Sequence, residues 1–193
     1  MTRPWGRYYE AAGADPRATL LLALDLFGEG RGRLAVDLGC GSGRDTFELL
    51  RRGWRVLAVD AEQEGIERLL ATDGLELDRL EVCVARFQDA LWPAAELVNA
   101  SFALPFCPPA AFPAVWEQIV ESLPPGGRFS GQLFGERDGW CDQPELTFHT
   151  RAEAEELLAG FELERFDEVE EDGSTVLGEP KRWHLFHVVA RKR

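Results

Sequence analysis

The chain has 193 residues, of which 45% are hydrophobic, and a formal net charge of −13. A chain of this length and composition buries a core without disulfides or a structural metal, so we expect a single domain over residues 1–193. The acidic balance argues against nucleic acid and anionic membrane as partners, because polyanions are bound by clustered lysine and arginine. The length leaves no room for a separate domain that docks a macromolecule, which favours a small-molecule partner, and we expect a monomer or homodimer.

The cysteines and the start of the chain favour a cytoplasmic protein. The four cysteines are far apart and form no C-x-x-C pair, which indicates free thiols in a reducing compartment. The first residues lack the apolar stretch of a secretory signal, and the apolar run Leu20–Phe27 is too short to span a bilayer.

Strand-like and helix-like segments alternate along the chain, which is typical of a parallel sheet with helices on both faces. A first helix is expected from Pro16 to Phe27, with Asp15 as its N-cap. Apolar runs predict strands at residues 34–36, 54–59, 80–85, 96–100 and 128–134. Helical patterns predict helices at residues 44–52, 62–71 and 112–123.

The last third of the chain begins with residues 135–149, which have no clear period and are expected to form a loop. A capping box from Thr150 to Glu153 predicts a helix that ends at Gly160. Strands at 161–169 and 183–190 are expected to form a final pair, with a connection that starts at Glu170. The acidic run Glu162–Asp172 is interpreted as a solvated edge strand, whose charges prevent edge-to-edge aggregation.

The most informative segment is a glycine-rich turn between the first predicted strand and the next helix. It reads Asp37-Leu38-Gly39-Cys40-Gly41-Ser42-Gly43-Arg44. Glycines at such a turn let backbone amides approach a ligand, and the helix N-terminus adds partial positive charge. The dinucleotide-binding pattern G-x-G-x-x-G would need a third glycine at position 44, where Arg44 stands.

This sequence pattern, with Asp37 two residues before Gly39, resembles the first motif of the class I S-adenosylmethionine-dependent methyltransferases. Four further segments resemble later motifs of that family in the same order: Val56–Asp60, Phe87–Asp89, Leu97–Phe102 and Leu123–Gly127. Together they cover roughly half of the chain, from Leu34 to Phe134. The overall plan, ending in Trp183–Arg191, is also similar to small bacterial methyltransferases of the tellurite-resistance type.

The resemblance implies a Rossmann-like α/β fold, in which a seven-stranded, mostly parallel sheet has an antiparallel last strand. It implies S-adenosylmethionine as cofactor and S-adenosylhomocysteine as product. Asp60 would receive both ribose hydroxyls, with an N-cap role for the following helix as the alternative. Arg44 would pair with the cofactor carboxylate or lie in solvent, and Gln88 and Asp89 would hold the adenine or belong to an ordinary loop. The cofactor set is Asp37, Gly39, Cys40, Gly41, Arg44, Asp60, Ala61, Phe87, Gln88, Asp89 and Asn99.

Two segments are expected to lie over the cofactor: a lid and helix in residues 1–30, and a substrate loop at 135–149. The candidate substrate residues are Tyr8, Tyr9, Phe102, Arg137 and Trp140, with an ordinary surface loop as the alternative for 135–149. His149 is the candidate general base. His184 and His187 lie three apart on a strand and so face opposite sides, and we expect no metal site.

The predicted reaction is methyl transfer from S-adenosylmethionine to O, N or S of a small acceptor, either an organic molecule or a metalloid. Two alternatives stay open. One is a regulatory protein that binds S-adenosylmethionine without catalysis, and the other is an NAD(P)-dependent oxidoreductase.

Overall fold

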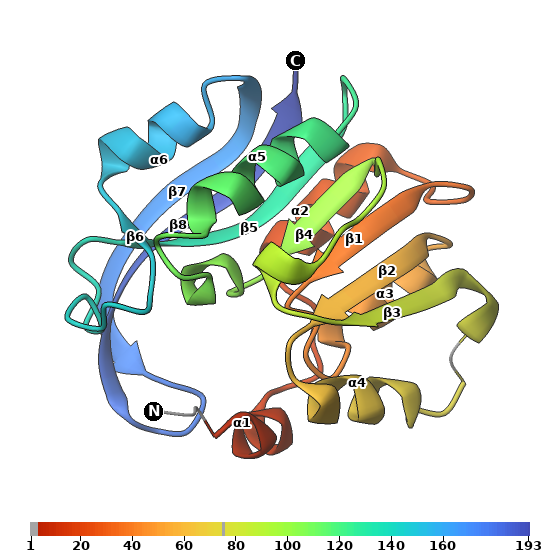
Figure 1. Ribbon diagram of the computed structural model, residues 1–193, viewed down its shortest axis with the longest axis horizontal. Helices are drawn as coiled ribbons and strands as arrows, with labels where there is room; N and C mark the ends of the chain where they lie inside the picture. Colours follow the sequence, from red (N-terminus) through yellow and green to blue (C-terminus); the bar gives the residue numbers. More distant parts are fainter. Residues whose placement is uncertain (1–3, 75) are drawn as a thin grey trace.

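The computed structural model describes residues 4–74 and 76–193 of the chain, and residues 1–3 and 75 of the expected domain lie outside the described residues. One eight-stranded sheet runs through the described part (Figure 1). Its strands follow the order β3-β2-β1-β4-β5-β8-β7, and β6 pairs with β5. Their bounds are β1 Leu34–Leu38, β2 Arg55–Asp60, β3 Leu80–Val84, β4 Leu97–Ala100, β5 Arg128–Gly135, β6 Phe148–His149, β7 Phe161–Ser174 and β8 Pro180–Lys192.

The expected mostly parallel sheet with an antiparallel last strand is confirmed. Strands β1 to β5 pair in parallel, whereas β8 runs antiparallel to both β5 and β7. The expected count of seven strands is wrong, because β6 is an eighth. Its two residues, Phe148 and His149, pair with Phe134 and Gly135 at the end of β5, within a segment expected to be a loop throughout.

Helices cover both faces of the sheet, as predicted (Figure 1). One face carries α2, α3 and α4, whose apolar side chains pack around Trp54 and Leu97. The other carries α5 and α6, which pack on Phe129 and Phe186. The helix bounds are α1 Trp5–Ala11, α2 Ala18–Phe27, α3 Arg44–Arg51, α4 Gln63–Leu70, α5 Phe112–Ser122 and α6 Arg151–Leu157. None of these helices is long and apolar enough to cross a membrane, in the part of the chain that the structure describes.

Two predicted helix boundaries need correction. Helix α2 begins at Ala18 with Arg17 as N-cap, so Asp15 and Pro16 stand outside it. Arg17 is extended because its backbone N–H donates to Asp45 Oδ1, at 2.9 Å. The capping box from Thr150 to Glu153 is confirmed, but α6 ends at Leu157, before the predicted end at Gly160.

The final strand pair is a long hairpin whose tip curls past the sheet toward α1 (Figure 1). The expected connection at Glu170 is wrong, since residues up to Ser174 remain paired with β8. Strand β7 is the edge strand, as predicted. Its carboxylates are not all solvated, however: Glu164 pairs with Arg128 at 2.7 Å, and Glu168 contacts the buried His184 at 2.9 Å.

Candidate functional site

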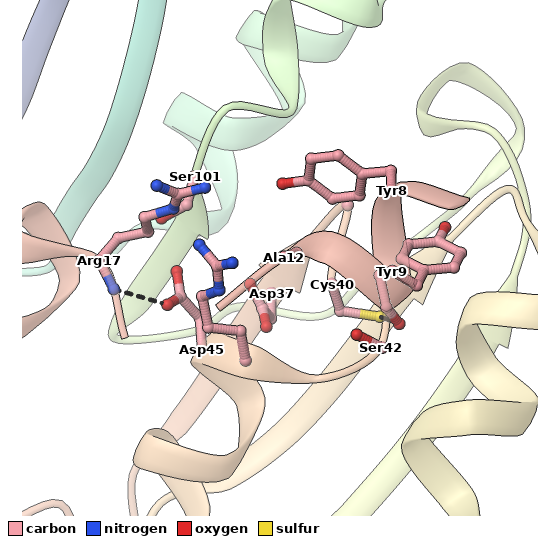
Figure 2. Close-up of a pocket in the computed structure, with 12 residues that line it drawn as sticks. Tyr8, Tyr9, Ala12, Arg17, Asp37, Cys40, Ser42, Asp45 and Ser101 are labelled. Carbon is pink, nitrogen blue, oxygen red and sulfur yellow. Dashed lines mark hydrogen bonds between the residues drawn. The ribbon is translucent and has the colours of Figure 1, made fainter. Parts of the chain in front are cut away.

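A cleft lies where the sheet reverses its strand order. Strands β2 and β3 follow on one side of β1, and the chain then crosses to the other side of β1, where β4 and β5 lie. Ligands of open α/β sheets bind at the carboxyl ends of strands beside such a reversal. The cleft sits at the carboxyl ends of β1 and β4, between the glycine-rich turn and α1 (Figure 2). It is lined by Tyr8, Tyr9, Ala12, Arg17, Asp37, Gly39, Cys40, Gly41, Ser42, Arg44, Asp45 and Ser101.

The glycine-rich turn forms one wall of the cleft and requires glycine on steric grounds. Gly39 has a φ of 71°, and a Cβ built there would lie 2.4 Å from the Cβ of Ala103. Gly41 has a φ of 54°, and a Cβ there would lie 3.1 Å from Cε1 of Tyr9. Helix α3 starts directly after the turn, so its N-terminus contributes partial positive charge at this wall. Cys40 lies in the turn, and burial, first of all, raises the pKa of its thiol, which makes it a poor nucleophile.

Two buried carboxylates support the floor of the cleft. Asp37, on β1, accepts hydrogen bonds from Thr46 Oγ1 at 2.6 Å and Asn99 Nδ2 at 2.9 Å. The same Asn99 nitrogen donates to Asp45 Oδ2 at 3.0 Å. Burial and the neighbouring Asp45 raise the pKa of Asp37 to about 7. Asn99 is fully buried beneath the cleft and does not line it, so the structure places it as a support for the two acids.

Asp60 ends β2 beside the turn. Its carboxylate accepts the backbone N–H of Gly41 at 2.7 Å and of Glu62 at 2.8 Å. Burial raises its pKa, and these backbone hydrogen bonds oppose the rise. The N-cap position of α4 belongs to Glu62, so the alternative of Asp60 as the helix N-cap is wrong. A carboxylate has about four lone-pair sites, so Asp60 retains capacity to accept further donors.

Helix α1 covers the cleft from the side opposite the turn. Tyr8 and Tyr9 both line it, and Tyr9 lies over the turn beside Cys40 and Ser42 (Figure 2). Burial first, and then the charge of Asp60, raise the pKa of Tyr9. An ion pair between Glu10 and Arg68, at 3.2 Å, links α1 to α4.

Two arginines face the cleft. Arg44, at the start of α3, was expected here. Burial first, and then the charge of Arg17, lower the pKa of the Arg44 guanidinium. Sequence reasoning missed Arg17, together with Ala12, Ser42, Asp45 and Ser101. Arg17 has no motif signal, because its position depends on the hydrogen bond to Asp45, 28 residues away.

The remaining cofactor candidates lie outside the cleft lining. Phe87 is half-buried, and its ring approaches Gly39 and the turn. Gln88 and Asp89 are exposed in the short 3-10 helix η2, Phe87–Asp89, and Ala61 is exposed after β2. Their place at the carboxyl ends of β2 and β3 matches the expectation, and their contacts with a ligand stay a prediction.

A second cavity of about 460 Å³ opens between α1, the ends of β5 and β8, and the tip of the β7–β8 hairpin. It shares Tyr8 and Arg17 with the first cleft, so the two are contiguous. Three predicted substrate residues line it: Tyr8, Phe102 and Trp140. Its other aromatic lining residues are Trp5, Phe106, Phe134, Trp183 and His187.

Two other candidates lie elsewhere. Arg137 forms ion pairs with Glu168 at 2.9 Å and Glu170 at 3.0 Å on the hairpin, and lines neither cavity. His149 is buried with its ring 4.8 Å from that of Phe112, and burial lowers its pKa. It lines neither cavity, so its proposed role as a base gains no support from its position.

The histidines of β8 have separate environments. His184 is fully buried and accepts the backbone N–H of Arg137 at 3.0 Å, whereas His187 lines the second cavity. Among the described residues, no group of three or more His, Cys, Asp or Glu side chains is arranged to hold a metal ion.

Comparison with known proteins agrees with this geometry. Residues 35–127 match the methyltransferase domain family. A curated relative, carboxy-S-adenosyl-L-methionine synthase of Citrifermentans bemidjiense, is 33% identical over 125 residues, which cover 61% of this chain. The match takes in 50% of that relative, so the chain spans about half its length.

Solved structures share the fold. TehB from Haemophilus influenzae superposes with a TM-score of 0.79 at 18% identity, over 92% of this chain and 62% of that one. The 1,6-didemethyltoxoflavin-N1-methyltransferase of Burkholderia thailandensis superposes with a TM-score of 0.70 at 24% identity, over 97% of this chain and 82% of that one. The chain therefore contains a segment similar to the methyltransferase domain family and has the fold of these solved structures.

Proposed function

We propose that this chain transfers a methyl group from S-adenosylmethionine to a small-molecule acceptor. The observation that carries the proposal is the cleft at the strand-order reversal, where the glycine-rich turn faces Arg17 and Arg44 and adjoins Asp60. The fold relative from Burkholderia thailandensis, solved with 1,6-didemethyltoxoflavin and S-adenosylhomocysteine bound, supports a small acceptor.

Each part of the cleft suits one part of the cofactor. The Asp60 carboxylate, at the end of β2, accepts the ribose hydroxyls, with Ala61 beside it. Arg44 and Arg17 supply charge-assisted hydrogen bonds to the carboxylate of the methionine moiety. The backbone of Gly39, Cys40 and Gly41 approaches the ligand closely because the glycines have no side chain. Phe87, Gln88 and Asp89 flank the adenine, while Asp37 and Asn99 hold this arrangement from below.

The reaction mainly requires that the methyl donor and the acceptor be aligned. When bound, S-adenosylmethionine supplies an activated methyl carbon: an acceptor lone pair bonds to it, the C–S bond breaks, and S-adenosylhomocysteine remains. The protein contributes by holding donor and acceptor in line, which alone lowers a barrier by several kcal/mol, roughly 7 or more in favourable cases. Tyr8 and Arg17 stand where the two cavities meet and so define the line along which the methyl group passes.

We infer one methyltransferase domain over residues 1–193, with residues 1–30 as lid and helix and residues 135–149 as the substrate loop through Trp140. We infer a cytoplasmic protein, monomeric or homodimeric, that does not bind nucleic acid or membrane.

The test uses the protein with S-adenosylmethionine labelled in its methyl group and a panel of small metabolites. The proposal predicts labelled products and the release of S-adenosylhomocysteine. Binding of S-adenosylhomocysteine without any labelled product across the panel would favour the non-catalytic regulatory alternative. Turnover of NAD(P)H instead would favour the oxidoreductase alternative.

A further inference from the structure

The wall of the second cavity defines the shape of ligand that fits it. The cavity volume of about 460 Å³ lies within the range of small-molecule sites, roughly 300–1,000 Å³. Seven of its 17 lining residues are Trp, Tyr or Phe, and they come from different sides, with Trp5 on α1, Phe134 on β5 and Trp183 on β8. A small oxyanion such as a metalloid oxide would leave most of this apolar wall unused. A larger, apolar ligand makes use of it.

The rings of the wall meet edge to face. Trp5 and Phe106 have centroids 5.2 Å apart at an interplanar angle of 80°, and Phe134 and Trp183 are 6.2 Å apart at 70°. Aromatic groups prefer offset-stacked and edge-to-face contacts, so a flat ring system placed among these side chains meets both faces and edges. This arrangement favours a planar aromatic ligand over a saturated one of equal size.

Cations of the protein already lie on several of these rings. The Lys181 ammonium is 3.8 Å from the ring centroid of Trp183 and 3.9 Å from that of Trp140. The Arg17 guanidinium carbon is 4.5 Å from the ring centroid of Phe102. A cationic ligand would compete with these contacts and be repelled by Arg17, which itself lines the cavity. Glu171 and Glu179 also line it, but they are exposed at the hairpin tip, where solvent and salt screen them.

His187 offers a hydrogen-bond donor to the ligand. Gln132 is oriented by the backbone N–H of Phe102, which donates to its Oε1 at 2.8 Å. Its Nε2 therefore donates toward His187 Nδ1, at 3.4 Å, and leaves the proton of the neutral ring on Nε2. Burial and the charge of Arg165 lower the pKa of His187, in keeping with a neutral ring at pH 7.

We propose that the acceptor is a planar aromatic or heteroaromatic molecule, neutral or anionic, bound in this cavity with its nucleophilic atom at the junction lined by Tyr8 and Arg17. The inference rests on the proposed function, since it assumes that the first cleft holds the methyl donor. His187 and Arg17 would donate hydrogen bonds to a carbonyl, a ring nitrogen or an oxyanion of the acceptor.

The experiment is titration calorimetry on the full chain saturated with S-adenosylhomocysteine, using three probes of similar size. These are 2-naphthoate, which is planar and anionic, its saturated counterpart decalin-2-carboxylate, and the cation N,N,N-trimethyl-2-naphthylammonium. The naphthoate is expected to bind at least tenfold more tightly than either of the others. Equal binding, a preference for the saturated or cationic probe, or no binding of the naphthoate overturns the inference. Failure of S-adenosylhomocysteine to bind in the first step overturns the proposed function instead.

Variants locate the binding site. Trp5→Leu and Trp183→Leu are each expected to weaken naphthoate binding at least fivefold. Trp5 lies on a helix without buried residues, so its replacement should leave the fold intact, which thermal unfolding by circular dichroism checks. The matched control is Phe27→Leu, an aromatic residue of α2 that packs on Trp54 and lines neither cavity; its affinity should change less than twofold. Unchanged naphthoate affinity in both tryptophan variants would place the ligand elsewhere and contradict the inference.

Discussion

Asn99 donates from a single amide nitrogen to two carboxylates, 2.9 Å to Asp37 Oδ1 and 3.0 Å to Asp45 Oδ2. The other oxygen of Asp45 accepts the backbone N–H of Arg17. This chain of hydrogen bonds joins β1, β4, the start of α3 and the start of α2. It therefore fixes the position of Arg17 relative to the glycine-rich turn, although the two segments are far apart in the sequence.

The buried Asp37 gives stability a specific pH dependence. Its pKa is raised from 3.8 to about 7 by burial and by Asp45, so between about pH 4 and pH 7 the folded state keeps a proton that the unfolded state releases. The free energy of unfolding contributed by Asp37 therefore falls as the pH rises through this window. In Asp37→Asn, the amide can accept from Asn99 and donate to Thr46, and this contribution disappears.

We expect the stability of Asp37→Asn relative to the natural chain to improve by about 2 kcal/mol between pH 5 and pH 8. Urea denaturation at each pH measures it, and taking the difference between the two proteins removes the contribution of the histidines. A difference that does not vary with pH would show that Asp37 titrates normally.

Arg44 is expected to bind the carboxylate of the methionine moiety. Hydrogen bonds to charged groups contribute about 1.5–3 kcal/mol, so Arg44→Gln should weaken S-adenosylhomocysteine binding about tenfold or more. Binding of 5′-methylthioadenosine, which lacks the amino-acid moiety, should change less than twofold. The control is Arg51→Gln on the same helix, since the Arg51 side chain is 70% exposed and pairs with Glu48. Equal losses for both ligands would instead assign Arg44 a structural role.

Helix α1 should be held in place by a ligand beneath it. The helix has no buried residue, and its ion pair from Glu10 to Arg68 is exposed and contributes at most about 1 kcal/mol. Trypsin should therefore cleave after the exposed Arg7, and S-adenosylhomocysteine should slow that cleavage at least fivefold. Glu10→Gln should speed the cleavage about twofold without ligand. Cleavage after Arg31, in the exposed loop between α2 and β1, is the internal control, and equal protection at both sites would contradict a lid.

The sequence predicted the sheet well because its signals are local. Buried parallel strands are short apolar runs, and the turn after β1 requires glycines at Gly39 and Gly41, whatever the rest of the chain does. The amphipathic spacing of α5 is equally local, and its predicted face, with Phe112, Trp116 and Ile119, is buried.

The rest depends on contacts between distant segments. Strand β6 has two residues and exists only because β5 offers a partner. Arg17 lines the cleft because its backbone N–H donates to Asp45. Arg137 lies away from the cleft because its guanidinium pairs with Glu168 and Glu170 on the hairpin. The second cavity takes side chains from α1, from the segment after β4 and from both strands of the hairpin, so no single stretch of sequence carries its signature.

The central claim is that the cleft at the carboxyl ends of β1 and β4 binds the methyl donor, with Asp60 at the adjoining end of β2 as a ligand of its ribose. Titration calorimetry with S-adenosylhomocysteine tests it most directly, on the natural chain and on Asp60→Ala, with thermal unfolding as a check on the fold. We expect one bound molecule per chain and a dissociation constant at least tenfold higher in the variant. Tight NAD(P) binding without S-adenosylhomocysteine binding, or an unchanged constant in Asp60→Ala, would contradict it.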